Sequence, residues 1–163
     1  MSIMIRRMTD SEFENVYQWS VKHNAKELMD ELNMSQQDAI KETIDEVARM
    51  LPDGLNTENN HLMTIVELSS EEVAGFIWTL HEEYAGRKQC FVCDFAIYES
   101  KRHKGYAQET LNLVERYAAE AGCHECVLFV ADRNFAARAL YEKCGYQFLR
   151  QEGYGRYMVK GLL

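Results

Sequence analysis

Four basic residues follow one another at residues 101–104, although the whole chain carries a formal net charge of −8. A glycine, a tyrosine and an alanine come next, followed by a stretch with helical apolar spacing. The first N–H groups of a helix have no partner inside it, and the helix dipole is positive there. A basic turn in this place binds anions, and Gly105 and Ala107 are small enough to let a ligand approach. The sequence therefore predicts an anion site, and the alternative is a solvated patch of positive charge.

The elements that must position this turn follow from apolar spacing and turn residues. Thr9 and Glu12 have the spacing of a capping box before the first helix. Helices are expected at residues 13–32, 35–51, 105–121 and 135–144. Strands are expected at residues 2–8, 61–68, 73–81, 90–98 and 125–131, with a last pair that turns near residues 153–155. The fold class is therefore α/β with a mixed sheet, in which the strands on either side of the third helix should be parallel.

The composition is that of an ordinary globular protein, with 163 residues, 47% of them hydrophobic and 27% charged. We expect one domain over residues 1–163. No apolar run approaches the roughly 20 residues that cross a bilayer. The N-terminus lacks the apolar region of an export signal, which favours a cytoplasmic location. The acidic balance argues against a nucleic-acid binder and favours a cationic substrate.

Four of the five cysteines form two C-x-x-C pairs, at residues 90–93 and 123–126. Such pairs can hold structural zinc. The first pair, however, lies in a run of strand-forming residues without a turn between the cysteines. The second pair joins the end of a predicted helix to the start of a strand. Buried reduced thiols are therefore the preferred interpretation, and a zinc site is the alternative.

Two motifs carry a resemblance to a known family, while the common nucleotide loops G-x-x-x-x-G-K-[ST] and G-x-G-x-x-G are absent. Residues 102–107, RHKGYA, match the motif R/Q-x-x-G-x-G/A between a predicted strand and a predicted helix. Residues 134–146, NFAARALYEKCGY, match the motif N-x-x-A-x-x-L-Y-E-K-x-G-F/Y. With this element order, the whole chain resembles the GNAT superfamily of acyl-CoA-dependent N-acetyltransferases, in particular small bacterial members with two N-terminal helices. The resemblance implies a mixed, mostly antiparallel sheet, with strands 4 and 5 parallel and splayed and with helices on both faces.

The resemblance also implies acetyl-CoA as cosubstrate and no metal. The pyrophosphate of coenzyme A is implied to lie on the backbone amides of Arg102, His103, Lys104, Gly105, Tyr106 and Ala107. The side chains of Lys101, His103 and Lys104 are expected to assist as exposed charges. The backbone of Phe95 and Ile97 is implied to pair with the acetyl carbonyl and the pantetheine arm. Asn134 is implied to contact that arm from the other side of the splay, and it can also cap the following helix.

For the chemistry, Tyr141 resembles the family's general acid, a phenol that protonates the departing thiolate. The alternative for Tyr141 is a core aromatic. The backbone N–H of Phe95 is the implied oxyanion donor. No base is assigned, because Phe91 stands where histone-directed relatives carry a glutamate, and an amine that arrives neutral needs no base. The candidates that strand order places within reach are Asp94, His81, Glu82 and Glu83.

The resemblance implies an acetyl-CoA-dependent N-acetyltransferase that acts directly on a primary amine of a small molecule or peptide. The alternatives are a non-catalytic acyl-CoA-binding or regulatory module on the same fold, and a zinc-stabilised interaction domain. The acidic charge favours a cationic acceptor such as a polyamine, a lysine side chain or an aminoglycoside. We expect no nucleic-acid or membrane partner, and a homodimer through the C-terminal strands is common among relatives.

Overall fold

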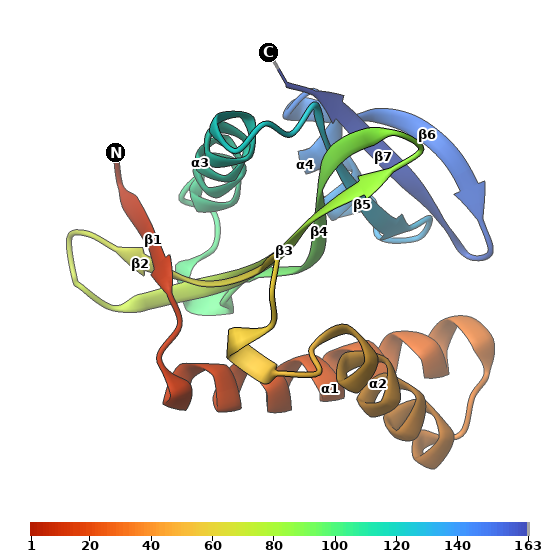
Figure 1. Cartoon of the computed structure of the whole chain (residues 1–163). Helices are drawn as coiled ribbons and strands as arrows, with labels where there is room; N and C mark the ends of the chain where they lie inside the picture. The colour runs from red at the N-terminus through yellow and green to blue at the C-terminus, as the bar shows by residue number, and fades with distance from the viewer. Residues whose placement is uncertain (163) are drawn as a thin grey trace.

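The computed structural model describes residues 1–162, which form one seven-stranded sheet and four α-helices (Figure 1). The strands are β1 (Ile3–Arg7), β2 (Asn60–Glu67), β3 (Val73–Tyr84), β4 (Arg87–Ile97), β5 (Glu125–Ala131), β6 (Gln147–Glu152) and β7 (Gly155–Gly161). The helices are α1 (Asp10–Leu32), α2 (Gln36–Met50), α3 (Tyr106–Glu120) and α4 (Phe135–Lys143), with short 3-10 turns η1 (Gly54–Asn56) and η2 (Glu99–Lys101). The predicted order of strands and helices is confirmed. Within the described residues, no helix combines the length and the apolar character needed to cross a membrane.

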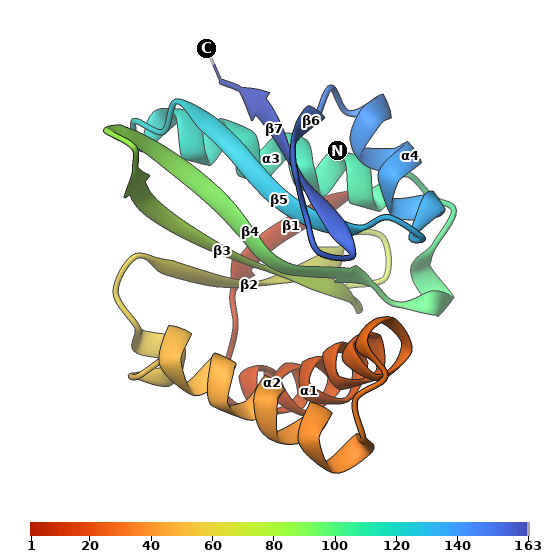
Figure 2. The same ribbon diagram turned by 90° about the vertical axis from the view of Figure 1, so that its right-hand side faces the viewer.

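The sheet has the order β1-β2-β3-β4-β5-β7-β6, and only its β4–β5 pair is parallel. These two strands pair only from Gln89↔Glu125 to Val92↔Leu128, although β4 continues to Ile97 and β5 to Ala131. The strands therefore separate at their carboxyl ends, which confirms the expected splay. Helices α1 and α2 cover one face of the sheet, and α3 and α4 lie on the other (Figures 1 and 2).

A capping box fixes the start of α1 against the sheet. Thr9 accepts the N–H of Glu12 and donates its own N–H to the Glu12 carboxylate. The same carboxylate accepts hydrogen bonds from Arg6 on β1 and from Thr64 on β2. The predicted capping box is confirmed, and it sets the direction in which α1 crosses under the sheet.

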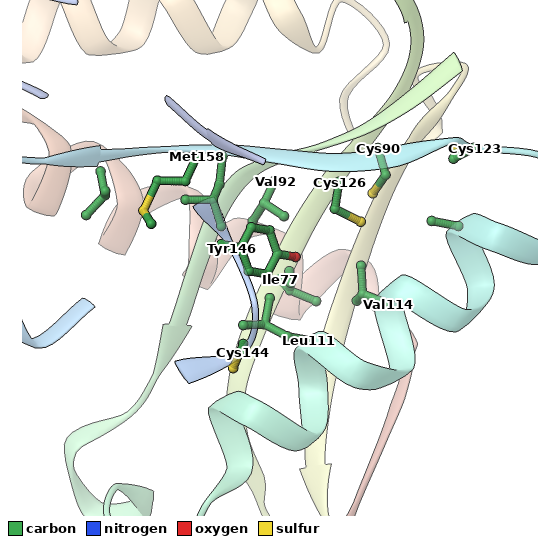
Figure 3. Packing of buried hydrophobic residues seen from close by; sticks show 13 residues of the cluster. Ile77, Cys90, Val92, Leu111, Val114, Cys123, Cys126, Cys144, Tyr146 and Met158 are labelled. Atoms are coloured by element: carbon green, nitrogen blue, oxygen red, sulfur yellow. The ribbon is translucent and has the colours of Figure 1, made fainter. Parts of the chain in front are cut away.

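The core between the sheet and α3 contains four of the five cysteines, all of them reduced. Figure 3 shows Cys90 and Cys126 side by side on the paired ends of β4 and β5, on the side that faces Val114 of α3. Cys93 instead packs against the cluster on the α1–α2 face. The two cysteines of the first C-x-x-C pair thus belong to separate layers. Among residues 1–162, no group of three or more His, Cys, Asp or Glu side chains is arranged to hold a metal ion.

The two strands of the β3–β4 hairpin are longer than the sequence predicts, and the loop between them is shorter. Tyr84 pairs with Arg87, and both intervening residues have positive φ, 52° at Ala85 and 77° at Gly86. A two-residue turn of this kind matches the twist of its strands, but alanine is an uncommon residue in it, so the turn signal was weak. The segment after residue 81, expected to be a loop, is therefore strand.

Candidate active site

A cavity of about 580 Å³ lies where β4 and β5 separate. Its lining comes from α1 and α2 on one side, from the separated strands, and from α4 and the β6–β7 hairpin on the other. It includes three of the predicted site residues, Phe95, Asn134 and Tyr141. A second hollow of about 680 Å³ lies along α1 and α2 and includes none of the predicted site residues. The cavity at the splay is therefore the place where the predicted chemistry converges.

The backbone of β4 presents an open edge to this cavity. The N–H of Tyr98 donates to the carbonyl of Ala74 on β3. Because successive N–H groups of a strand point to opposite sides, those of Ile97 and Phe95 face the edge where β5 has separated. On that edge Arg102 Nε also donates to the Ile97 carbonyl, at 3.0 Å. The backbone groups predicted to pair with a ligand therefore lie along the unpaired edge.

Asp94 occupies the centre of the site because of a bulge in β4. Trp78 of β3 pairs with Asp94 but Thr79 pairs with Val92, so Cys93 is an extra residue. The Asp94 carboxylate accepts the N–H of Phe95 at 2.9 Å. This amide is the predicted oxyanion donor, and in this structure it donates to the Asp94 side chain.

Two polar side chains of α1 hold the same carboxylate. Ser20 Oγ lies 2.7 Å and Asn24 Nδ2 lies 3.2 Å from Asp94 Oδ2. They are four residues apart and therefore share one face of the helix. Burial raises the pKa of Asp94, and the three hydrogen bonds oppose that rise. Sequence reasoning missed Ser20 and Asn24, although polar residues at helical spacing inside an apolar stripe were a usable signal.

Tyr141 projects from α4 into the cavity and packs on the edge of the core, 6.0 Å from Tyr146 between ring centroids. Its hydroxyl makes no hydrogen bond with any of residues 1–162. Burial, followed by the nearby charge of Asp94, raises the pKa of Tyr141 to about 12. The phenol is therefore protonated at neutral pH and free to donate a hydrogen bond into the cavity.

Asn134 caps α4 and also lines the cavity. Its Oδ1 accepts the N–H of Ala137 at 3.3 Å, as the helix-cap interpretation predicts. The cap fixes the first turn of α4, and Tyr141 lies about two turns further along the same helix. The side-chain NH2 group of Asn134 remains free to donate, because the helix cap uses only the side-chain oxygen.

The basic turn presents free backbone amides at the start of α3. The first helical hydrogen bond runs from Glu109 N–H to the Gly105 carbonyl, so in the described chain the amides of residues 103–108 have no protein acceptor. The amide of Arg102 is the exception among those predicted, since it donates to the Glu99 carbonyl at 3.3 Å. His103 and Gly105 have φ of 64° and 80°, left-handed conformations that turn the chain sharply before the helix.

The side chains of this turn correct one expectation. Lys101, expected to be exposed, retains only 12% of its side-chain accessibility and pairs with Glu67 and Glu72. Glu67 is itself buried and also accepts hydrogen bonds from Lys104 and Tyr106. Four hydrogen-bond donors, Ser70 first among them, hold the pKa of Glu67 far below its usual range. Part of the basic run is therefore structural, because its charges balance a buried carboxylate.

Of the four candidate bases, only Asp94 lines the cavity. His81 and Glu82 lie on the part of β3 that pairs with Cys90 and Gln89, before the splay begins. Glu82 accepts a hydrogen bond from Gln89 Nε2 at 3.0 Å, and Glu83 pairs still further toward the hairpin end. The structure thus brings Asp94, Tyr141 and the Phe95 amide together and leaves the other three candidates outside.

Comparisons with known proteins identify the family and the fold of the chain. Residues 14–146 match the model of the Acetyltransferase (GNAT) family. The uncharacterized N-acetyltransferase YycN of Bacillus subtilis (strain 168) is 31% identical over 147 residues, which cover 90% of this chain and 94% of YycN. The crystal structure of YycN superposes with a TM-score of 0.86 at 30% identity, over 93% of this chain and 96% of that one.

Two more distant solved structures share the fold. The PaiA N-acetyltransferase of Thermoplasma acidophilum, in complex with coenzyme A, has a TM-score of 0.73 at 17% identity, over 99% of both chains. The spermidine N-acetyltransferase of Vibrio cholerae, in complex with CoA and spermine, has a TM-score of 0.69 at 15% identity, over 98% of this chain and 95% of that one. With the family match over most of its length, the chain belongs to the GNAT acetyltransferase family and is an N-acetyltransferase.

Proposed function

We propose that this enzyme transfers the acetyl group of acetyl-CoA directly to a primary amine of a small molecule or peptide. The observation that carries the proposal is the meeting of two groups in one cavity. The Phe95 N–H lies on the open edge of β4, and Tyr141, whose hydroxyl has no hydrogen-bond partner among residues 1–162, lines the same cavity. In the proposed reaction, the Phe95 N–H stabilises the oxyanion and the Tyr141 hydroxyl protonates the leaving group.

The residues present fit coenzyme A as the acetyl carrier. The free amides of residues 103–108, at the positive end of α3, suit the pyrophosphate. The pantetheine arm can run along the edge at Phe95 and Ile97 as an added strand would. Asn134 then contacts the arm through its side-chain amide from the α4 side. The coenzyme A complexes of the two distant relatives support this assignment.

The reaction needs one bond to form and one to break. The neutral amine nitrogen attacks the thioester carbonyl carbon, the C–N bond forms, and the negative charge that develops on the carbonyl oxygen is met by the Phe95 N–H. Collapse of this intermediate breaks the C–S bond, and the Tyr141 phenol gives its proton to the sulfur. The amine nitrogen loses its extra proton to water in the cavity. Because the Phe95 N–H donates to Asp94 in this structure, the amide must exchange this carboxylate for the acetyl oxygen.

The test is amine-dependent release of the CoA thiol. Purified protein is incubated with acetyl-CoA and a panel of primary amines, lysine peptides and aminoglycosides, and mass spectrometry detects the acetylated product. An enzyme-only blank is required, because the chain has five free cysteines of its own. We expect acetylated product from at least one amine. If calorimetry shows acetyl-CoA binding but no amine in the panel is acetylated, the proposed acetyl transfer is wrong and a non-catalytic acyl-CoA-binding module is the better description.

A further inference from the structure

The cavity is lined by carboxylates without matching cations. Four acidic side chains reach it, and the lining includes no lysine or arginine from the described residues. They are Glu27, Glu46, Asp94 and Glu152. The remaining titratable groups of the lining are His23 on α1, Cys93 on β4 and the phenols of Tyr141, Tyr154 and Tyr157. The carboxylates of the lining therefore outnumber its basic side chains.

These carboxylates are not neutralised from outside the cavity either. None of the four forms an ion pair with a Lys or Arg among residues 1–162, whereas the neighbouring Glu31 pairs with Arg133 at 3.2 Å. Burial raises the pKa of both Asp94 and Glu27, and the nearby charges of Glu31 and Asp94 raise the pKa of Glu27 as well. Hydrogen bonds to the two carboxylates oppose the rise in each. Keeping carboxylates close together and partly buried costs free energy, which a bound cation would recover.

Aromatic rings provide the second part of a cation site. The Tyr154 hydroxyl donates to Glu27 Oε2 at 3.1 Å, and its ring packs edge to face with Phe129, 5.7 Å between centroids. Phe91 and Tyr157 line the same wall, 6.2 Å apart between ring centroids. Methylene groups pack well on such a wall, and ammonium groups bind the ring faces. Arg150 already stacks over the Tyr157 ring at 4.2 Å, so one face of that ring holds a cation in this structure.

The position of these groups relative to the reacting centre indicates what kind of cation they receive. One cavity is lined both by Tyr141, whose hydroxyl has no partner in the described chain, and by carboxylates of α1 and α2. We propose that the acceptor is a small linear amine with two or more positive charges, a diamine or polyamine. One amine reacts beside Phe95 and Tyr141, while a second, still protonated, is held by Glu27 and Glu46 against the Tyr154 wall. This inference rests on the proposed acetyl transfer and names its substrate class.

The spacing on α1 limits the distance between the two nitrogens. Asn24, which holds Asp94, and Glu27 are three residues apart, a rise of about 4.5 Å along the helix. A second charge a few methylene groups from the reacting nitrogen therefore reaches Glu27. A lysine side chain of a peptide carries one amine, which the reaction uses. A peptide acceptor would therefore leave Glu27 and Glu46 without a bound cation.

The first experiment compares acceptors that carry a second charge with acceptors that lack one, and putrescine and 4-amino-1-butanol form the pair of equal length. Putrescine and spermidine are compared with 4-amino-1-butanol and n-butylamine at saturating acetyl-CoA. Because a hydrogen bond between a charged amine and a partly buried carboxylate is strong, we expect kcat/KM to be about tenfold or more higher for putrescine than for 4-amino-1-butanol. Equal values for the two, or a lysine peptide that exceeds every diamine, would overturn the substrate class.

The second experiment removes the proposed carboxylates one at a time. Glu27→Gln and Glu46→Gln keep the size of the side chain and remove its charge. The quantity compared is the kcat/KM for putrescine divided by the kcat/KM for 4-amino-1-butanol. We expect each variant to lower this ratio by about fivefold or more. The matched control is Glu42→Gln on the same helix as Glu46, because Glu42 is exposed and faces Arg49 at 3.6 Å. If the control lowers the ratio as much as Glu46→Gln, the effect is general electrostatic attraction and the inference is wrong.

A binding measurement separates this inference from the proposed reaction. Spermidine is titrated calorimetrically into the full chain and into the Glu27→Gln variant, in the absence of acetyl-CoA. If spermidine binds, Glu27→Gln weakens it, and no amine is acetylated, the proposed function fails and the polyamine site stands. If monoamines and diamines are acetylated equally well, the reaction stands and the polyamine site fails. Absence of spermidine binding to the wild-type chain also overturns the site.

Discussion

The Nζ atom of Lys101 lies 2.9 Å from Oε1 of Glu67. This pair joins the end of β2 to the turn before α3, and Lys104 and Tyr106 contact the other carboxylate oxygen. One buried carboxylate thereby holds three residues of the turn that presents its amides to the anion. The side chains of Lys101 and Lys104 therefore help to fix the conformation of the turn. The backbone amides of residues 103–108 are the groups that remain available to bind an anion.

Replacing Lys101 should therefore cost stability in a way that an exposed lysine does not. In Lys101→Ala the Glu67 carboxylate loses its most buried cation, and we expect a clear fall in the midpoint of thermal unfolding. The control is Lys26→Ala, which also breaks a short ion pair, 2.6 Å from Asp30, but at a side chain that is 74% exposed. Circular dichroism melting of both variants checks this. Equal midpoints would show that the Lys101 pair contributes no more than a surface pair.

Acid should destabilise the fold through Glu12. Its hydrogen bonds with Arg6, followed by those with Thr9 and Thr64, lower the pKa of Glu12 to about 2 in the folded chain. A carboxyl with a depressed folded pKa stabilises the fold above its unfolded pKa, and this contribution is lost as the pH falls. We expect the free energy of unfolding to decline between about pH 4.5 and pH 2.

Urea denaturation of the wild type and of Glu12→Gln across this pH range measures the effect. The variant should start less stable at pH 7 and lose less stability on acidification. The control, Glu14→Gln on the exposed side of α1, keeps the capping box and should show the full decline of the wild type. A Glu12→Gln variant with the same pH dependence as the wild type would contradict the assignment.

Gly105 and Gly122 make a matched pair for testing the anion turn. Both have left-handed φ, 80° and 90°, and neither has any atom within 4 Å of the position of an added Cβ. Leucine at either position costs about 1–2 kcal/mol of backbone strain. Only Gly105 lies among the free amides, so we expect Gly105→Leu to weaken acetyl-CoA binding by calorimetry and Gly122→Leu to leave it unchanged. Equal affinities for the two variants would remove the pyrophosphate from this turn.

The sequence was sufficient for what depends on local pattern. The capping box, the element order, the parallel pair around α3 and the place of the basic turn all follow from neighbours in the chain. The partners of that turn do not, because Glu67 is distant in the chain and its place near the end of an expected strand does not mark it as a buried anchor. The same holds for Asp94, which needs both a bulge and two donors from α1. Contacts of this kind arise only when separate elements pack.

Tyr141→Phe tests the proposed general acid with the smallest change available. It removes only the hydroxyl, which has no hydrogen-bond partner in residues 1–162, so the fold should keep its stability. A general acid contributes roughly 10²–10⁴-fold to a proton-transfer step, and we expect kcat to fall at least about tenfold while the Kd for acetyl-CoA is retained. The control is Tyr98→Phe, a half-buried phenol that does not line the cavity.

The pH profile adds a second readout for the same residue. Because the pKa of Tyr141 is raised to about 12, the phenol keeps its proton across the working range. Activity should therefore rise with pH as the acceptor amine becomes neutral, without an alkaline fall below about pH 10. In Tyr141→Phe the rise should persist at a lower plateau, since the amine and not the phenol controls it. The opposite result would be a wild-type rate that falls above pH 9 together with a Tyr141→Phe rate that does not fall. It would show that the Tyr141 phenol loses its proton at a lower pH, and the buried environment that raises its pKa would be wrong.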